Sequence, residues 1–299
     1  TIITLDTLKS EHSKKAYRRA LADFWQWYRD MGRPEFRKAT IQRYRAELEA
    51  QGMKAGNVNL RLAAIRAMLR EGAENGLIAE QEARSGQAVK SISAPGRSVG
   101  VWLDKSQAEA FINNIPRVTL ANKRDFTLVC LFLSSGLRRS EMASLTIEHI
   151  KQVEGRWAIL GIVGKRNKTR DVPITPWAKY AVDEWAAAAG ITEGIVFRPV
   201  NKGDKLAGDS MTPEAIRQTI DRAISQANAN GAGLPAIGAH DLRRTFAQLA
   251  RKGGAKIEQI QKALGHESIK TTEVYLGSGQ DFQNAPCDAL KLDVQARAA

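Results

Sequence analysis

Residues 240–275 read HDLRRTFAQLARKGGAKIEQIQKALGHESIKTTEVY, and this stretch carries the most informative pattern in the chain of 299 residues. Apolar residues recur at helical spacing over 240–251 and over 257–264, so two helices are predicted there. Gly265 follows the second helix and is expected to end it. A new helix is predicted after His266. His240 and Arg243 are three residues apart, on one helix face.

Two segments upstream carry side chains of the same kind: GLRRSE at 136–141 and GKRNKTR at 164–170. Cleaving a phosphodiester bond without a metal needs a nucleophile, positive charge at the phosphate oxygens, an acid for the leaving oxygen and a base for the nucleophile. Arginine suits the phosphate, because its planar guanidinium stays charged and binds two oxygens at once. Histidine and lysine suit the proton transfers. Each segment alone is a weak signal, and the order and spacing of all of them indicate the chemistry.

Taken together, these segments resemble the ordered signature of the tyrosine recombinase (phage integrase) family, which is Arg, Lys, His-x-x-Arg, His and Tyr. The resemblance covers the chain after about residue 100. It implies that Tyr275 is the nucleophile and forms a 3′-phosphotyrosyl bond with DNA. It implies further that Arg138 and Arg243 clamp the scissile phosphate, that His240 helps accept the tyrosine proton and that His266 hydrogen-bonds a phosphate oxygen.

The resemblance assigns two more residues. Lys165 matches the catalytic lysine of the family's β-hairpin, which implies that it protonates the 5′ oxygen that leaves. Lys168 lies in the same turn, so it stays open as the alternative lysine. Glu141 matches an acidic position one helical turn after Arg138 and is expected to hold basic groups in place. A plain surface glutamate is the alternative interpretation of Glu141.

Hydrophobic periodicity predicts a mainly helical chain with two domains. Residues 1–92 are expected to form an all-helical domain that resembles, more weakly, the SAM-like core-binding domain of the family. Its helices are predicted at about 13–31, 40–50, from 57 onward and 78–88, with Ser13 capping the first. Residues 93–100 are rich in Ser, Pro and Gly and are predicted to be a linker.

Residues 101–299 are expected to form an α+β catalytic domain. Helices are predicted at 105–114, 122–135, 176–189 and 212–228, with a β-hairpin at 157–174. The tail from about 281 to 299 is expected to dock on a neighbouring protomer. The two domains are expected to close on DNA as a two-lobed clamp.

Charge points to the partner. The chain has 45 Lys and Arg against 32 Asp and Glu, a net charge of +13 and a pI of about 9.9. A strongly basic chain usually binds a polyanion, and double-stranded DNA is the expected one. The predicted DNA contacts are Arg61, Arg66, Arg70, Arg166 and Lys168, although a solvated helix face also explains the first three.

Composition also bears on where the protein acts. No apolar run approaches the roughly 20 residues that a membrane-spanning helix needs. Two cysteines, Cys130 and Cys287, fit a reducing cytoplasm, where the bound protein would be associated with the nucleoid. We expect no cofactor and no metal, because the four histidines include no pair at ligand spacing. This argues against a metal-dependent nuclease.

The resemblance implies a homotetramer on two synapsed DNA duplexes that passes through a Holliday junction, with the free protein a monomer or a weak oligomer. Two other functions stay open. A type IB topoisomerase would use the same phosphotyrosyl chemistry without synapsis. A non-catalytic DNA-binding protein could share the fold, although binding alone would not need all six predicted catalytic residues. Integration, excision and dimer resolution are not distinguished by these residues.

Overall fold

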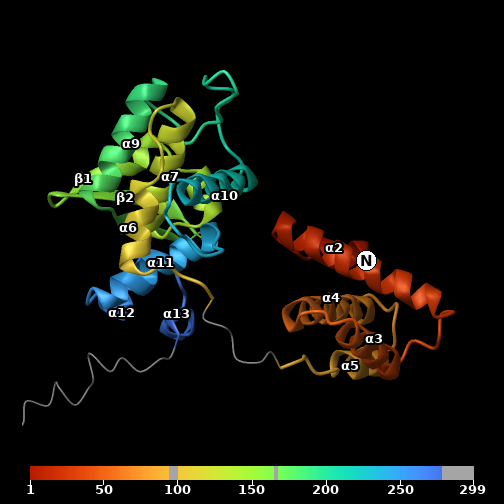
Figure 1. The fold of residues 1–299 in the computed structure, drawn as a ribbon. Coiled ribbons are helices and arrows are strands. Elements are labelled where there is room, and N and C mark those ends of the chain that lie inside the picture. The colour runs from red at the N-terminus through yellow and green to blue at the C-terminus, as the bar shows by residue number, and fades with distance from the viewer. Residues whose placement is uncertain (94–99, 165–167, 278–299) are drawn as a thin grey trace, which may run out of the picture. The chain divides into compact units, whose positions relative to one another are not determined.

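The computed structural model describes residues 1–93, 100–164 and 168–277. The chain divides into two compact units, Thr1–Arg97 and Ser98–Ala299, which are described separately. Both units are mainly helical, and the second contains a small antiparallel sheet (Figure 1). This confirms the predicted mainly-α fold class with a small β element.

The first unit packs its helices around one aromatic-rich core. Phe24 is fully buried there, and its ring stacks on Trp27 at 5.9 Å and meets Tyr44 edge-on at 5.1 Å. Such pairs stabilise a small core beyond the area that they bury. The helices of this unit are α1 (Ile2–Asp6), α2 (Glu11–Asp30), α3 (Lys38–Ala50), α4 (Ala55–Glu74) and α5 (Glu80–Gln87).

Two details at the start of this unit differ from the sequence prediction. Helix α1 was not expected, because a five-residue helix is too short to show a periodic pattern. Helix α2 begins at Glu11, two residues before the predicted cap. Ser10 has extended backbone angles and its side chain accepts a hydrogen bond from the backbone N–H of Ser13, so Ser10 is the N-cap and Ser13 lies inside the helix.

The second unit is built around α7 (Leu120–Ser135), which is buried over most of its length. A buried Asp125 on α7 accepts hydrogen bonds from Arg124 and from Arg222 of α10, and so joins these two helices. The other helices are α6 (Lys105–Asn113), α8 (Arg139–Ala143), α9 (Pro176–Ala189), α10 (Pro213–Ala229), α11 (Ala239–Lys252), α12 (Ile257–Leu264) and α13 (Ile269–Leu276), with a 3-10 turn η1 (Ile147–His149).

The sheet has three antiparallel strands in the order β1 (Ile150–Val153), β2 (Arg156–Val163) and β3 (Thr169–Pro173). Strands β2 and β3 form the predicted hairpin. Strand β1 was missed, because its four residues are mostly exposed and show no alternation. The β1–β2 turn has positive φ at both Glu154 and Gly155, as a two-residue hairpin turn of type I′ requires.

Candidate active site

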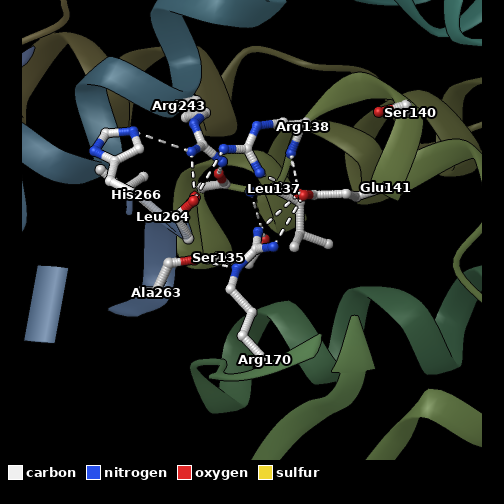
Figure 2. Close-up of polar contacts among 12 residues, drawn as sticks. Ser135, Leu137, Arg138, Ser140, Glu141, Arg170, Arg243, Ala263, Leu264 and His266 are labelled. Carbon is white, nitrogen blue, oxygen red and sulfur yellow. Dashed lines mark hydrogen bonds and ion pairs between the residues drawn. The ribbon is translucent and has the colours of Figure 1, made fainter. Parts of the chain in front are cut away.

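Glu141 is the centre of a polar cluster in the second unit (Figure 2). Helix α7 ends at Gly136, which has a left-handed φ of 60°, and the chain turns there so that Arg138 becomes the N-cap residue of α8. Arg138 donates its backbone N–H to Glu141 Oε2 at 2.7 Å and its Nη1 to Glu141 Oε1 at 2.7 Å. The Glu141 side chain is only 3% exposed, so it is not a plain surface glutamate.

Arg170 of β3 completes the cluster, and the sequence analysis did not place it in the site. Its Nη1 donates to Glu141 Oε1 at 2.9 Å, and its Nη2 donates to Oε2 at 2.7 Å. Burial by itself raises the pKa of Glu141, but the hydrogen bonds from Arg170 and Arg138 outweigh it and lower that pKa to about 2. Glu141 is therefore a carboxylate at neutral pH, held between two guanidinium groups.

Arg243 of α11 lies beside this cluster and is 2% exposed. Its Nη1 donates to the carbonyl oxygen of Gly136 at 2.6 Å, and its Nη2 donates to the carbonyl oxygen of Leu264. Burial and the nearby charge of Arg138 lower the pKa of Arg243 to about 10. The guanidinium is still a cation at neutral pH, and backbone carbonyls from two distant segments fix its place.

His266 is brought to the same point by the end of α12. Gly265 ends that helix with a φ of 62°, which confirms the predicted helix end. His266 Nε2 lies 3.4 Å from Arg243 Nη2, and its Nδ1 lies 3.0 Å from Thr272 Oγ1. Burial, followed by the charges of Arg243 and Arg138, lowers the pKa of His266 to about 4. The ring is neutral at neutral pH, so Nε2 accepts from Arg243 and Nδ1–H donates to Thr272.

Tyr275 of α13 faces both predicted histidines. Its ring centre lies 5.8 Å from that of His240 and 5.2 Å from that of His266, edge-on in both cases. The Arg244 guanidinium lies 5.1 Å from the centre of the same ring. The hydroxyl of Tyr275 is buried and has no hydrogen-bond partner within 3.5 Å among the residues that the structure describes, although Arg243 is near enough for its charge to oppose the rise that burial causes in the pKa of this hydroxyl. A buried hydroxyl without a partner requires an explanation, and a partner supplied by a substrate is one.

Burial and nearby charges shift the pKa values of Tyr275 and His240. Burial raises the pKa of Tyr275, and the positive charges of Arg243 and Arg244 oppose that rise. His240 is exposed in the first turn of α11, yet partial desolvation lowers its pKa, and Arg244 and Arg243 lower it further. His240 is therefore neutral at neutral pH and able to accept a proton.

The turn between β2 and β3 is only partly described. Lys165 and Arg166 lie outside the described residues, so the prediction of Lys165 as the catalytic lysine stays a prediction. Lys168 is 71% exposed, and its Nζ lies 3.9 Å from Glu267 Oε1. The choice between Lys165 and Lys168 rests on the sequence signature alone.

The arginines of α4 belong to the first unit. Arg61 forms an ion pair with Asp23 at 2.7 Å and is 16% exposed. Arg66 donates to the backbone oxygen of Val89 and to the hydroxyl of Ser91. Arg70 is 56% exposed and has a long contact of 3.4 Å to Glu71. Their contacts to DNA stay predictions, and Arg70 presents the most accessible charge of the three.

Within residues 1–93, 100–164 and 168–277, no three His, Cys, Asp or Glu side chains gather as metal ligands would. In the same ranges, no helix has the length and apolar character needed to cross a membrane.

Comparison with known proteins identifies the family. The sequence profile of the phage integrase family matches residues 101–280. Tyrosine recombinase XerC of Pseudomonas putida (strain W619) is 29% identical over 283 residues, which cover 92% of this chain and 87% of that protein. XerC of Xylella fastidiosa (strain M23) is 29% identical over 277 residues, which cover 92% and 88%.

Solved structures show the same fold. The XerH site-specific recombinase bound to difH substrate superposes with a TM-score of 0.68 at 20% identity, over 93% of this chain and 79% of that one. The Tn1549 transposon integrase in complex with circular intermediate DNA gives a TM-score of 0.71 at 16% identity, over 95% of both chains. These relatives do not favour the topoisomerase or the non-catalytic binding protein. Because the family profile covers more than half of its length, the chain belongs to the phage integrase family and is a tyrosine recombinase, an enzyme of site-specific DNA recombination.

Proposed function

We propose that this recombinase cleaves and rejoins double-stranded DNA through a covalent bond between Tyr275 and a 3′ phosphate. One observation carries the proposal. The buried hydroxyl of Tyr275 has no hydrogen-bond partner among the described residues, and its ring faces His240 and His266. Arg243 contacts His266 and is near enough to Tyr275 for its charge to oppose the rise that burial causes in the pKa of the Tyr275 hydroxyl. These contacts support Tyr275 as the nucleophile, His240 as its base and Arg243 as a cation for the phosphate.

Arg138 and Arg243 would hold the scissile phosphate. Arg138 is 34% exposed, so its guanidinium is accessible to a ligand. Arg243 is 2% exposed, and its hydrogen bonds to backbone carbonyls fix the position of its charge. Fixed cations stabilise the extra negative charge of the phosphorane without having to reorganise during the reaction. His266 would join them through Nε2. To donate to a phosphate oxygen, the neutral ring must carry its proton on Nε2, and Nδ1 then accepts from the Thr272 hydroxyl. The negative charge of the phosphate favours this tautomer over the one in which Nε2 accepts from Arg243.

The cleavage step balances in protons. The Tyr275 oxygen attacks phosphorus, and its proton passes to His240. The bond from phosphorus to the 5′ oxygen breaks, and Lys165 protonates that oxygen. The free 5′-hydroxyl of a partner strand then attacks the phosphorus of the phosphotyrosyl bond and gives its proton to Lys165. The bond from phosphorus to the Tyr275 oxygen breaks, and Tyr275 recovers its proton from His240. The phosphotyrosyl bond conserves the energy of the broken bond, so no nucleotide cofactor is needed.

The remaining parts extend this scheme. Residues 1–92 would act as the core-binding domain and residues 101–299 as the catalytic domain, joined by the linker at 93–100. Arg61, Arg66, Arg70, Arg166 and Lys168 would contact the DNA backbone, which carries most of the affinity. Four protomers would hold two duplexes and pass through a Holliday junction. The tail at 281–299, which lies outside the described residues, would dock on a neighbour. The enzyme would act in the cytoplasm, on nucleoid DNA.

The test is to trap the covalent bond in cells. The tagged protein is expressed in cells that hold its native DNA, which are lysed under denaturing conditions with a chelator present. DNA that stays attached is sequenced. The wild type is expected to enrich one short sequence, and Tyr275→Phe is expected to enrich none.

Tyr180→Phe is the matched control, because Tyr180 is a 65% exposed tyrosine on α9 of the same unit. It should behave like the wild type. Attached DNA that persists in Tyr275→Phe would assign the nucleophile to another residue. Attachment spread evenly over many sequences would indicate a relaxing topoisomerase instead.

A further inference from the structure

The side chain of Arg170 joins three separate segments of the second unit. Its Nη1 and Nη2 donate to the two oxygens of Glu141 on α8, at 2.9 and 2.7 Å. Its Nε donates to the carbonyl oxygen of Ala263 on α12, at 2.8 Å. The side chain is 10% exposed. Arg170 therefore connects β3 with the residues that precede His266 and with the helix turn that presents Arg138 (Figure 2).

Glu141 accepts four hydrogen bonds in this arrangement, two at each oxygen, from Arg138 and Arg170. A carboxylate has about four acceptor sites, so they are filled. If Arg170 were removed, a buried carboxylate would keep Arg138 as its main cationic partner. Arg138 would then be drawn toward Glu141 and away from a ligand.

The chain is shaped to admit this arginine. Gly265 lies against it, and a Cβ at that position would stand 3.0 Å from Arg170 Cδ and 3.1 Å from Nε. Lysine could not replace it, because a single ammonium cannot present the planar fork and the Nε–H to partners on opposite sides. Each of its three nitrogens donates to a protein acceptor, and the side chain is only 10% exposed, so Arg170 is placed to hold protein groups and not a substrate.

We propose that Arg170 is a positioning residue, which holds Glu141 so that Arg138 faces the scissile phosphate, and holds the Ala263 carbonyl so that His266 stays beside Arg243. This inference rests on the proposed function of Arg138 and His266. It separates two kinds of arginine in the cluster. Arg138 and Arg243 act on the phosphate, and Arg170 acts through the placement of Arg138 and His266.

The first experiment measures binding and cleavage separately, on the DNA sequence recovered with the wild type. Arg170→Gln is expected to bind that DNA within about threefold of the wild type and to cleave it about 100-fold more slowly at saturating DNA, which is the order expected for a misplaced catalytic group. Arg170→Lys should not restore the rate. The control is Arg156→Gln, which removes the same charge from an exposed position on β2 and should cleave like the wild type.

A double variant distinguishes positioning from general loss of structure. Arg170→Gln leaves the Glu141 charge underpaired, and Glu141→Gln on top of it removes that charge. The double variant is expected to cleave faster than Arg170→Gln alone, at a temperature well below the melting point of each protein. Equal or slower cleavage by the double variant would overturn the proposal. So would a loss confined to DNA affinity, because it would make Arg170 a direct phosphate contact.

A measurement without DNA keeps the proposal testable if no covalent complex forms. The ring protons of His266 and His149 can be followed by NMR as pH varies. Arg170→Gln is expected to change the chemical shifts and the titration of His266. The chemical shifts of His149, which is hydrogen-bonded to Thr146, should stay those of the wild type. An unchanged His266 would overturn the positioning role, whereas failure of the wild type to trap DNA would overturn only the cleavage chemistry.

Discussion

The arginines of α4 and those around Glu141 differ in how many carboxylates they have as partners. On α4, Arg61 has its own carboxylate in Asp23, and Arg66 is held by Val89 and Ser91. In the second unit, Arg138 and Arg170 share the single carboxylate of Glu141. Arg243 is held by backbone carbonyls, which carry no net charge.

The difference decides where positive charge is left for a phosphate. On α4, Arg61 and Arg70 each contact a carboxylate of their own, and only Arg66 is bonded to neutral oxygens alone. One carboxylate for two arginines, with a third arginine bonded to neutral oxygens, leaves a cluster with excess positive charge. Burial strengthens the attraction of this charge for an anion, because solvent screens it less. The cluster around Glu141 is therefore built for an anion, and the α4 arginines contribute mainly through what stays exposed.

The largest expected effect is that of Glu141→Ala. Removing the carboxylate leaves the Arg170 charge buried without its partner, and this charge then repels that of Arg138. Breaking a buried pair in this way costs roughly 3–5 kcal/mol in the free energy of unfolding. Urea unfolding, with hydrogen exchange resolving peptides of the two units, would measure it. The first unit should keep its stability. A loss below about 1 kcal/mol would mean that the shared carboxylate is not what holds the cluster together.

The second prediction uses pH to test the same carboxylate. The pKa of Glu141 is about 2 in the folded chain and 4.5 ordinarily. A lowered pKa gives stability that is present above pH 4.5 and is lost as pH falls toward 2. Between pH 5 and pH 3, the wild type should lose about 2 kcal/mol more than Glu141→Gln, which has no proton to bind there. Equal losses in the two proteins would show that Glu141 is not held as a carboxylate.

A smaller effect is expected at Gly265. Gly190 and Gly265 end α9 and α12 with φ of 64° and 62°, but a Cβ would meet nothing within 4 Å at Gly190 and would press on Arg170 at Gly265. Gly190→Ala should cost about 1 kcal/mol for the left-handed backbone alone. Gly265→Ala should cost more and should also slow cleavage. Thermal melts and the cleavage assay would measure both, and equal melting points with equal rates would contradict the role of Arg170.

The sequence predicted residues that the structure brings together, but it did not predict the residue that supports them. Arg138, His240, Arg243, His266 and Tyr275 stand in short segments whose order is diagnostic, and the structure brings these segments together. Arg170 is the last residue of the GKRNKTR segment. The direction of its side chain depends on the register of β3 against β2 and on a bulge between Ile159 and Ile162. Local sequence does not encode that register, because the partners of Arg170 lie 29 and 93 residues away in the chain.

The smallest expected effect concerns the arginines of α4. Each phosphate contact adds about 0.9 to the slope of log affinity against log salt. Arg70→Gln should lower that slope by about this amount, because Arg70 is 56% exposed. Arg61→Gln should leave it nearly unchanged and cost stability instead, because Arg61 is 16% exposed and already paired with Asp23. Titrations of the recovered DNA at several salt concentrations would measure both slopes. A lower slope for Arg61→Gln would mean that DNA displaces Asp23, and then an internal pair on α4 would be as available to a phosphate as an exposed arginine.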